Sequence, residues 1–233
     1  MIYPYYQDGS CTIYHADCMA VLPQLEVVFD TVDFMLTDPP YGLNGGRGNG
    51  NAKCGKMKYE IRSAGWEDTE KYVSEVVVPM IRMGINISER AIVTPGNRCL
   101  WMYPVPVTMG CFFYPSSTGW TEWGLNSLSP ILYYGIDPRQ GRRGTSSTGR
   151  MVNELAPKNG HPCPKPYNSW KWLLNKGSLE GETVLDPFMG SGTTLRVAKD
   201  LGRKGIGIEI EERYCEIAAK ILSQEVLDFG QRG

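Results

Sequence analysis

The stretch TVLDPFMGSGTTLRVAKDLGRKGIGIE, residues 183–209, alternates short apolar runs with a glycine-rich turn. Such runs are typical of buried strands, and the segment after the glycines is typical of a helix that Gly202 is suited to end. We predict a strand over 183–186, a turn over 190–192, a helix over 193–201, a strand over 204–209 and a helix over 211–229. This strand–helix–strand–helix order is typical of a parallel sheet with right-handed crossovers.

The N-terminal part of the chain adds elements of the same kinds. Apolar residues recur at helical spacing in some segments and form short buried runs in others. The predicted strands cover 11–14, 31–36, 90–94 and 129–134, and the predicted helices cover 19–25 and 72–83. Pro130 places the start of the last strand at an edge. The chain is thus predicted to form an open, mostly parallel α/β sheet.

Composition limits the class of protein. The chain has 233 residues, 42% of them apolar, which suits one large domain or two small ones. No apolar run approaches the roughly 18 residues that a membrane span needs, and the N-terminus lacks a signal-peptide pattern. Seven cysteines are scattered without a C-x-x-C pair, and the two histidines are His15 and His161. We expect a soluble intracellular protein without a disulfide framework or a metal site.

The net charge of −1 hides two basic segments. Residues 47–62 contain five basic side chains and one acidic one, a net of +4. Residues 139–150 contain no acid and four arginines, namely Arg139, Arg142, Arg143 and Arg150. Basic loops on an acid-leaning body suit local contacts with phosphates. Charge alone fits the alternative at least as well, in which both segments are simply solvated loops.

The glycine turn, Gly190–Gly192, predicts a nucleoside site. Glycines let a ligand approach the backbone, and the N-terminus of the following helix offers free N–H groups. Glu209 ends the next strand, where a carboxylate accepts hydrogen bonds from the vicinal hydroxyls of a ribose. Leu195 stands where the nicotinamide fingerprint has its third glycine, so a ribose without a pyrophosphate suits the sequence better. The alternative is an ordinary tight turn beside a solvated glutamate.

An apolar run ends in an unusual corner, Asp38–Tyr41, within MLTDPPYGLN, residues 35–44. Pro39 and Pro40 hold the backbone extended. The Asp38 carboxylate and the Pro39 carbonyl are then two acceptors aimed the same way, which suits one NH2 group, and Tyr41 offers a face for stacking. The corner therefore predicts a site for an aromatic amine. The alternatives are a capping or turn role for Asp38 and core packing for Tyr41.

Together these motifs resemble those of amino-group DNA methyltransferases that use S-adenosylmethionine (SAM). TDPPYG resembles the family's catalytic motif and DPFMGSGTT its cofactor motif. IYHADCMAVLPQL, residues 13–25, is similar to a family segment with Asp17-Cys18 in the matching place, and HPCPKP, residues 161–166, to the segment that enters the cofactor motif. The order, catalytic motif first, is that of the circularly permuted β-group. His15-Ala16 and Cys163-Pro164 depart from the family pattern.

The resemblance implies a Rossmann-like methyltransferase fold, with a mostly parallel seven-stranded sheet and helices on both faces. It covers nearly the whole chain except roughly 42–70 and 97–155. It implies one catalytic domain over 1–233, with a mobile loop over 42–62 and a small target-recognition insert over about 126–160. The recognition region is short, which suggests a short target or a homodimer. The implied setting is the cytoplasm of a prokaryotic cell, with double-stranded DNA as partner and no membrane contact.

The resemblance also implies roles for individual residues. The catalytic residues are Asp38, Pro39, Pro40 and Tyr41. The cofactor-binding residues are Asp17, Asp38, His161, Lys165, Asp186, Phe188, Gly190, Ser191, Gly192, Thr193 and Glu209. The DNA-contacting residues are Arg139, Arg142, Arg143 and Arg150, and no metal ligand is implied. Helix capping is an equal alternative for Asp17, and surface solvation for His161 and Lys165. Core or hairpin packing is preferred over base stacking for Trp101, Trp120 and Trp123.

By the same resemblance, the target base is flipped out of the duplex and stacks on Tyr41, while Asp38 and the Pro39 carbonyl hold its amine. Asp38 favours adenine, because relatives that act on cytosine amines more often have Ser there. Methylation of cytosine N4, of an RNA base or of a glutamine amide is the alternative. An inactive nucleic-acid-binding module and a nicotinamide oxidoreductase belong to other classes. The intact corner argues against the first and Leu195 against the second.

Overall fold

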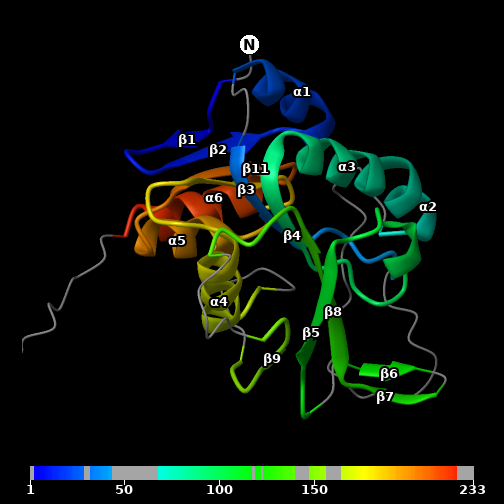
Figure 1. Cartoon of the computed structure of the whole chain (residues 1–233). Helices are drawn as coiled ribbons and strands as arrows, with labels where there is room; N and C mark the ends of the chain where they lie inside the picture. The colour runs from blue at the N-terminus through cyan, green and yellow to red at the C-terminus, as the bar shows by residue number, and fades with distance from the viewer. Residues whose placement is uncertain are drawn as a thin grey trace, which may run out of the picture.

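The computed structural model describes residues 3–28, 32–43, 68–116, 119–121, 123–139, 147–155 and 164–224. Within these residues, nine strands form one sheet, two form a separate hairpin, and helices cover both faces of the sheet (Figure 1). The strands of the sheet are β1 (Tyr6–Gln7), β2 (Cys11–His15), β3 (Val32–Thr37), β4 (Ser88–Val93), β5 (Thr108–Phe113), β8 (Leu128–Tyr134), β9 (Arg150–Met151), β10 (Thr183–Asp186) and β11 (Lys204–Glu209). The hairpin consists of β6 (Gly119–Thr121) and β7 (Gly124–Asn126).

The order across the sheet is β1-β2-β11-β10-β3-β4-β8-β5-β9. The five neighbouring strands from β2 to β4 are parallel. β8 lies antiparallel between β4 and β5, and β1 is an antiparallel edge strand. The central strands β3, β10 and β11 are nearly continuous runs of buried residues, as parallel strands covered on both faces require.

Helices from different parts of the chain cover the two faces. One face carries α1 (Cys18–Val28) and a helical segment made of α2 (Glu70–Tyr72), the π-helical stretch η2 (Val73–Val77) and α3 (Val78–Asn86). The other face carries α4 (Tyr167–Gly177), α5 (Thr193–Asp200) and α6 (Glu212–Leu222), and a short 3-10 helix, η3 (Leu100–Met102), follows β4. Successive side chains of β3 serve opposite faces. Phe34 and Leu36 pack in the cluster with α4 and α5, and Met35 packs in the cluster with α3.

The connections reverse direction between β10 and β3. From β10 the chain passes through α5 to β11, and from β3 it passes through α2, η2 and α3 to β4 on the other side. Ligands of open α/β sheets bind outside the carboxyl ends of the strands at such a switch point. The corner follows β3 and the glycine turn follows β10, so both predicted sites lie at this one edge.

The predicted fold class is confirmed. Seven strands form the body of the sheet, and β1 and β9 add two residues each at its edges. Pro130 lies in β8, which is an interior strand, but beyond the residues that pair with β4, so its missing N–H leaves no gap in that ladder. The sequence analysis missed α4, β5 and the β6–β7 hairpin. No helix within the described ranges is long and apolar enough to span a bilayer.

Parts of three predicted segments fall outside the described residues. They are 44–62 of the predicted mobile loop, 225–229 of the last predicted helix, and 140–146 and 156–160 of the predicted recognition insert. Within that insert, Leu128–Tyr134 forms β8 and belongs to the main sheet. The division of the chain into a catalytic domain with a recognition insert stays a prediction.

α4 begins with a cap that comes from another part of the chain. Pro166 precedes the helix and supplies no side-chain cap. Instead, the Glu154 carboxylate accepts hydrogen bonds from the backbone N–H groups of Asn168 and Ser169, at 3.0 and 2.6 Å, and from the Ser169 hydroxyl at 2.6 Å. A carboxylate at a helix N-terminus also complements the helix dipole. Because Glu154 follows β9, this cap ties the end of the sheet to α4.

Gly177 ends α4 where the helix touches a buried ring, and this contact predicts a loss of stability on substitution. A Cβ at Gly177 would lie 2.2 Å from two ring carbons of Phe34, which is fully buried. Overpacking costs about 1–3 kcal/mol, and alanine gains about 1 kcal/mol in a helix. With a clash this close, we expect Gly177→Ala to lower the free energy of unfolding by about 2 kcal/mol, measured by urea denaturation.

Gly9→Ala is the matched control, because nothing lies within 4 Å of a Cβ built at Gly9. It is expected to change the free energy of unfolding by less than about 0.5 kcal/mol. Equal stability of the two variants would contradict the tight packing of α4 on β3.

Candidate active site

The Asp38 carboxylate accepts hydrogen bonds from two hydroxyl groups and forms an ion pair with a lysine. Its Oδ1 accepts from the hydroxyl of Tyr41 at 2.5 Å and from that of Thr94 at 2.5 Å. Its Oδ2 pairs with the ammonium group of Lys165. The Asp38 side chain is 12% exposed, so these partners replace most of its contact with water. Two donors on one oxygen fix the orientation of the carboxylate.

Tyr41 lies against the segment that follows β4, Thr94–Cys99, which we call the β4 loop. Gly96 has a φ of +66°, and a Cβ there would lie 2.6 Å from Cγ of the Tyr41 ring. Gly42 has a φ of +74°, and a Cβ there would lie 2.7 Å from Sγ of Cys99. Glycine is therefore required at both positions for the close approach and for the backbone conformation. The β4 loop thus supports both ends of the Tyr41–Gly42 step.

The ammonium group of Lys165 lies over two aromatic rings as well as beside Asp38. Its Nζ is 5.4 Å from the centroid of the Tyr41 ring and 5.8 Å from that of the Trp170 ring. A cation over a ring face is attracted by the quadrupole of the ring. Trp170 in turn donates its Nε1–H to the Thr194 hydroxyl at 3.1 Å, which links this site to the start of α5.

The Glu209 carboxylate holds the glycine turn. Its Oε2 accepts from the Gly190 N–H at 2.8 Å and its Oε1 from the Glu211 N–H at 2.8 Å. Burial raises the pKa of Glu209 to about 7. Gly192 has a φ of +80°, and a Cβ there would lie 2.7 Å from Cβ of Ala218. Each oxygen of Glu209 keeps a further lone pair. The turn and the carboxylate therefore fit the ribose of the implied cofactor.

Asp186 is buried beneath the glycine turn, where it is 3% exposed. Its Oδ1 accepts from the Thr37 hydroxyl at 2.7 Å and the Phe188 N–H at 3.1 Å, and its Oδ2 from the Thr194 hydroxyl at 2.6 Å. Burial raises the pKa of Asp186 to about 6. The carboxylate connects the ends of β3 and β10 with the first turn of α5. It braces the turn from inside, and its predicted contact with the cofactor stays a prediction.

Asp17 follows β2, which is parallel to β11, so it lies at the same edge of the sheet as Glu209. Its Oδ1 accepts from the Met19 N–H at 2.9 Å, so the capping role for α1 is present, and the predicted cofactor contact stays a prediction. Tyr72 lies near both carboxylates. Burial raises the pKa of Tyr72 to about 12, and the charges of Cys18, Asp17 and Glu209 add to the increase. The sequence analysis did not single out Tyr72.

The other residues predicted to bind the cofactor lie in or next to the glycine turn. Phe188 packs between the clusters that contain α1 and α3, Ser191 is buried, and Thr193 begins α5. His161 lies outside the described residues. The roles of these residues toward a cofactor stay predictions.

The predicted DNA-contacting arginines have different environments. Arg139 donates to the backbone carbonyls of Lys176 at 3.4 Å and Ser178 at 3.1 Å, at the C-terminal end of α4. The guanidinium of Arg139 therefore contributes to the C-terminal cap of α4, and its predicted contact with DNA stays a prediction. Arg150 is partly exposed in β9, in register with Phe112 of β5. Arg142 and Arg143 lie outside the described residues.

Two tryptophans differ from their predicted role in packing. Trp101 is 86% exposed and Trp123 is 99% exposed, so the prediction that they pack in the core or a hairpin is wrong for both. The structure does not test the prediction for Trp120. Trp101 belongs to η3, and Trp123 to the turn between β6 and β7, where the hairpin is too small to bury it.

The partners that orient the carboxylates of Asp38 and Asp186 were not predicted from the sequence. Thr94 and Gly96 support the corner, and Thr37 and Thr194 hold Asp186. A signal for Thr94 existed in the sequence. It ends a predicted strand, and the carboxyl ends of neighbouring parallel strands meet at one edge of a sheet. The sequence alone did not show that three threonines donate hydrogen bonds to the two aspartates, because two of these contacts depend on the order of the strands.

The chain is similar in sequence to known DNA methyltransferases. A family described as DNA methylase matches residues 120–220. The type II methyltransferase M2.DpnII of Streptococcus pneumoniae is 28% identical, over 97% of this chain and 94% of its own length. The type II methyltransferase M2.LlaDCHI of Lactococcus lactis subsp. cremoris is 26% identical, over 96% and 93%.

Solved structures share the fold at low sequence identity. The M1.HpyAVI–SAM complex has a TM-score of 0.64 at 18% identity, and the comparison covers 92% of this chain and all of that one. The PvuII DNA methyltransferase, described as cytosine-N4-specific, has a TM-score of 0.64 at 14% identity, with 95% and 96% covered. At these identities the likeness concerns the fold.

The buried Asp186 predicts a pH dependence of stability. Its pKa of about 6 in the folded protein exceeds the ordinary value of 3.8, so the folded state binds the proton more tightly. The contribution to stability is full below about pH 4 and is lost as the pH rises toward about 6. Two pH units at about 1.4 kcal/mol each give a loss of roughly 3 kcal/mol. Urea denaturation between pH 4 and 7 should show this loss in the wild type relative to Asp186→Asn. Parallel pH profiles for the two proteins would contradict it.

Proposed function

We propose that the chain is an amino-group DNA methyltransferase, and that it moves a methyl group from SAM to the exocyclic amine of adenine within a specific DNA sequence. The observation that carries the proposal is the placement of Asp38 and Glu209 at one edge of the sheet: Asp38 follows β3 at the switch point, and Glu209, at the end of β11, holds the glycine turn that follows β10. The Asp38 carboxylate suits an amine and the Glu209 carboxylate suits a ribose. Both lie at the same edge of the sheet.

In this proposal the corner binds and orients the target base. The Asp38 carboxylate and the Pro39 carbonyl accept the two hydrogens of the amine, and the Tyr41 ring stacks on the flipped base. Tyr41 and Thr94 hold the carboxylate in place through Oδ1, so its free rotation is already restricted. When bound, SAM supplies an electrophilic methyl group. Holding the amine in line with that group supplies much of the rate, and Asp38 accepts the proton that the amine then loses.

The glycine turn holds the cofactor in this proposal. Glu209 accepts hydrogen bonds from the ribose hydroxyls, Asp17 contacts the adenine of SAM, and Lys165 faces its methionine end. The M1.HpyAVI structure of the same fold was solved as a complex with SAM, which supports this assignment. No metal takes part in the proposed reaction.

Adenine is proposed over cytosine because Asp38 stands at the first position of the corner. The fold alone is compatible with both bases, since the PvuII enzyme of the same fold is described as cytosine-N4-specific. Methylation of cytosine N4 is therefore the second candidate. We further propose double-stranded DNA as the partner, with Arg150 and the basic segments as candidate phosphate contacts. Action as a homodimer, in the cytoplasm of a prokaryotic cell, completes the proposal.

Nucleoside mass spectrometry tests the proposal directly. The purified chain would be incubated with unmethylated genomic DNA and SAM, next to Asp38→Ala and the control Glu216→Ala, which changes an exposed acid on α6. We expect N6-methyladenine from the wild type and the control, and a roughly 100–1,000-fold lower yield from Asp38→Ala, as for the loss of other preorganised hydrogen-bond partners in active sites. N4-methylcytosine would replace the proposed base, and no methylated base would overturn the DNA assignment. Sequencing of the product gives the recognition sequence.

Glu209 predicts a pH dependence of cofactor binding. Ribose hydroxyls donate to the ionised carboxylate, and the pKa of Glu209 in the free protein is about 7. The affinity for SAM is expected to increase as the pH rises from 6 to 8 and to fall up to about tenfold per unit below the pKa. Glu209→Gln should bind SAM about 10–100-fold more weakly, with little dependence on pH.

Isothermal titration calorimetry at several pH values measures both effects. Glu212→Gln, which changes an exposed acid at the start of α6, is the control and is expected to behave as the wild type. A Glu209→Gln variant that keeps the affinity and pH profile of the wild type would exclude Glu209 from the ribose site.

A further inference from the structure

The acceptor that the target amine needs is already occupied. Oδ1 of Asp38 accepts from both Tyr41 and Thr94, and Oδ2 pairs with the ammonium group of Lys165. The two hydroxyls belong to the support of the corner, because they lie at the end of β3 and in the β4 loop. Oδ2 is therefore the atom that faces an incoming amine. Lys165 holds it from another part of the chain, in the segment that leads into α4.

The position of the ammonium group also overlaps the place of the base. Nζ of Lys165 is paired with Oδ2 of Asp38 and at the same time lies over the Tyr41 ring, 5.4 Å from its centroid. A base that stacks on Tyr41 and donates its amine to Oδ2 needs the volume between those two groups. The ammonium group of Lys165 and the exocyclic amine of a base both donate N–H hydrogen bonds. Lys165 can therefore occupy the position of the amine through the same kind of contact with Oδ2.

The contact that holds Lys165 is one that can be exchanged. The Lys165 side chain is 24% exposed, and its other neighbour is the Trp170 ring, 5.8 Å from Nζ. The Asp38 side chain is only 12% exposed, so the pair is largely withdrawn from water, and opening it is favourable only when new partners take over both charges. A lysine side chain has enough rotatable bonds to move its ammonium group without moving the backbone.

We propose that Lys165 is a plug of the amine site: in the cofactor-free protein its ammonium group occupies the place of the target amine, and the base engages Asp38 only after Lys165 has moved. This rests on the proposed function. Lys165 then exchanges its ion pair with Asp38 for one with the carboxylate at the methionine end of SAM. The start of α5 lies next to this site, since Trp170 donates to Thr194 there, and a helix N-terminus favours an anion. Cofactor binding thereby opens the base site.

A comparison of two DNA duplexes tests the plug without measuring catalysis. Both carry the recognition sequence found by the methylation assay, one with the target base and one with its analogue lacking the exocyclic amine, purine in place of adenine. Fluorescence anisotropy gives the ratio of their Kd values, analogue over target base. Any difference in base pairing between the duplexes affects all protein variants equally, so the change in this ratio between variants reports the contact of the amine with Asp38.

In the cofactor-free state, the ratio for Lys165→Met is expected to be about tenfold higher than for the wild type, the effect of one hydrogen bond to a charged group. S-adenosylhomocysteine, which keeps the carboxylate but has no methyl group to transfer, should raise the ratio of the wild type to that of the variant. Adding Asp38→Asn to Lys165→Met should return the ratio to the low value. Lys165→Gln repeats the test if the Met variant unfolds at a lower temperature.

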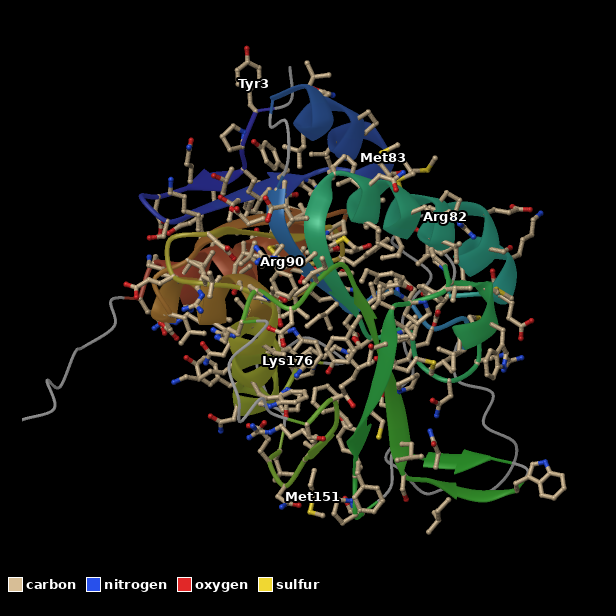
Figure 2. All side chains as sticks on the ribbon, in the orientation of Figure 1. Tyr3, Arg82, Met83, Arg90, Met151 and Lys176 are labelled. Carbon is tan, nitrogen blue, oxygen red and sulfur yellow. The ribbon has the colours of Figure 1, made fainter. Side chains whose placement is uncertain are left out.

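Lys176→Met is the matched control. Lys176, labelled in Figure 2, also lies over two aromatic rings, 5.7 Å from the Tyr133 centroid and 5.8 Å from the Trp172 centroid, but it lies near the C-terminal end of α4, whereas Lys165 precedes the N-terminal end. It should give the ratio of the wild type. Equal ratios for the wild type and both Lys165 variants would overturn the plug, and so would a wild-type ratio that S-adenosylhomocysteine does not raise. If the wild type methylates DNA in these cases, only the plug has failed. If it methylates no base at all, the proposed function has failed.

Discussion

The orientation of one carboxylate, that of Asp38, is the constraint on which the site depends. An aspartate at the end of a strand is free to rotate about its side-chain bonds and to turn toward water. Here the hydroxyls of Tyr41 and Thr94 fix Oδ1, and both side chains are held in place by tight packing. Thr94 is buried in the β4 loop, and the Tyr41 ring rests on Gly96. The result is an acceptor whose second oxygen points in one direction before any ligand arrives, which is how a site lowers the cost of reaching its reactive geometry.

The second carboxylate of the edge, Asp186, joins the corner to the cofactor turn. Burial removes water from the ionised carboxylate, which raises its pKa. The hydrogen bonds from the Thr37 and Thr194 hydroxyls replace part of the lost hydration. Because Thr37 directly precedes Asp38 and Thr194 lies in the first turn of α5, a displacement of either segment disturbs the same group. Trp170 extends this connection to α4 and to Lys165. The amine site and the cofactor turn are therefore parts of one hydrogen-bonded structure.

Local chemistry made part of this site predictable from sequence. Two prolines fix the corner after Asp38, and Glu209 is the last residue of a clear strand, so both carboxylates were placed correctly at a strand end. The partners were not predictable, because Thr94 is 56 residues from Asp38 and their contact depends on the order β3-β4 in the sheet. The cap of α4 comes from Glu154, so the sequence next to Tyr167 carried no start signal. Trp101 and Trp123 were expected to pack because of their size, but the 3-10 helix and the hairpin that carry them are too small to bury them.

A crystal structure of the protein with S-adenosylhomocysteine and a duplex containing its recognition sequence would show whether Asp38 holds the target amine. We predict that the exocyclic nitrogen of the target base lies about 2.7–3.2 Å from Oδ2 of Asp38 and from the Pro39 carbonyl oxygen. Thr94 and Tyr41 should still donate to Oδ1, and Lys165 should have left the carboxylate. A flipped base whose amine is bound by other groups, with the Lys165–Asp38 pair intact, would contradict the account.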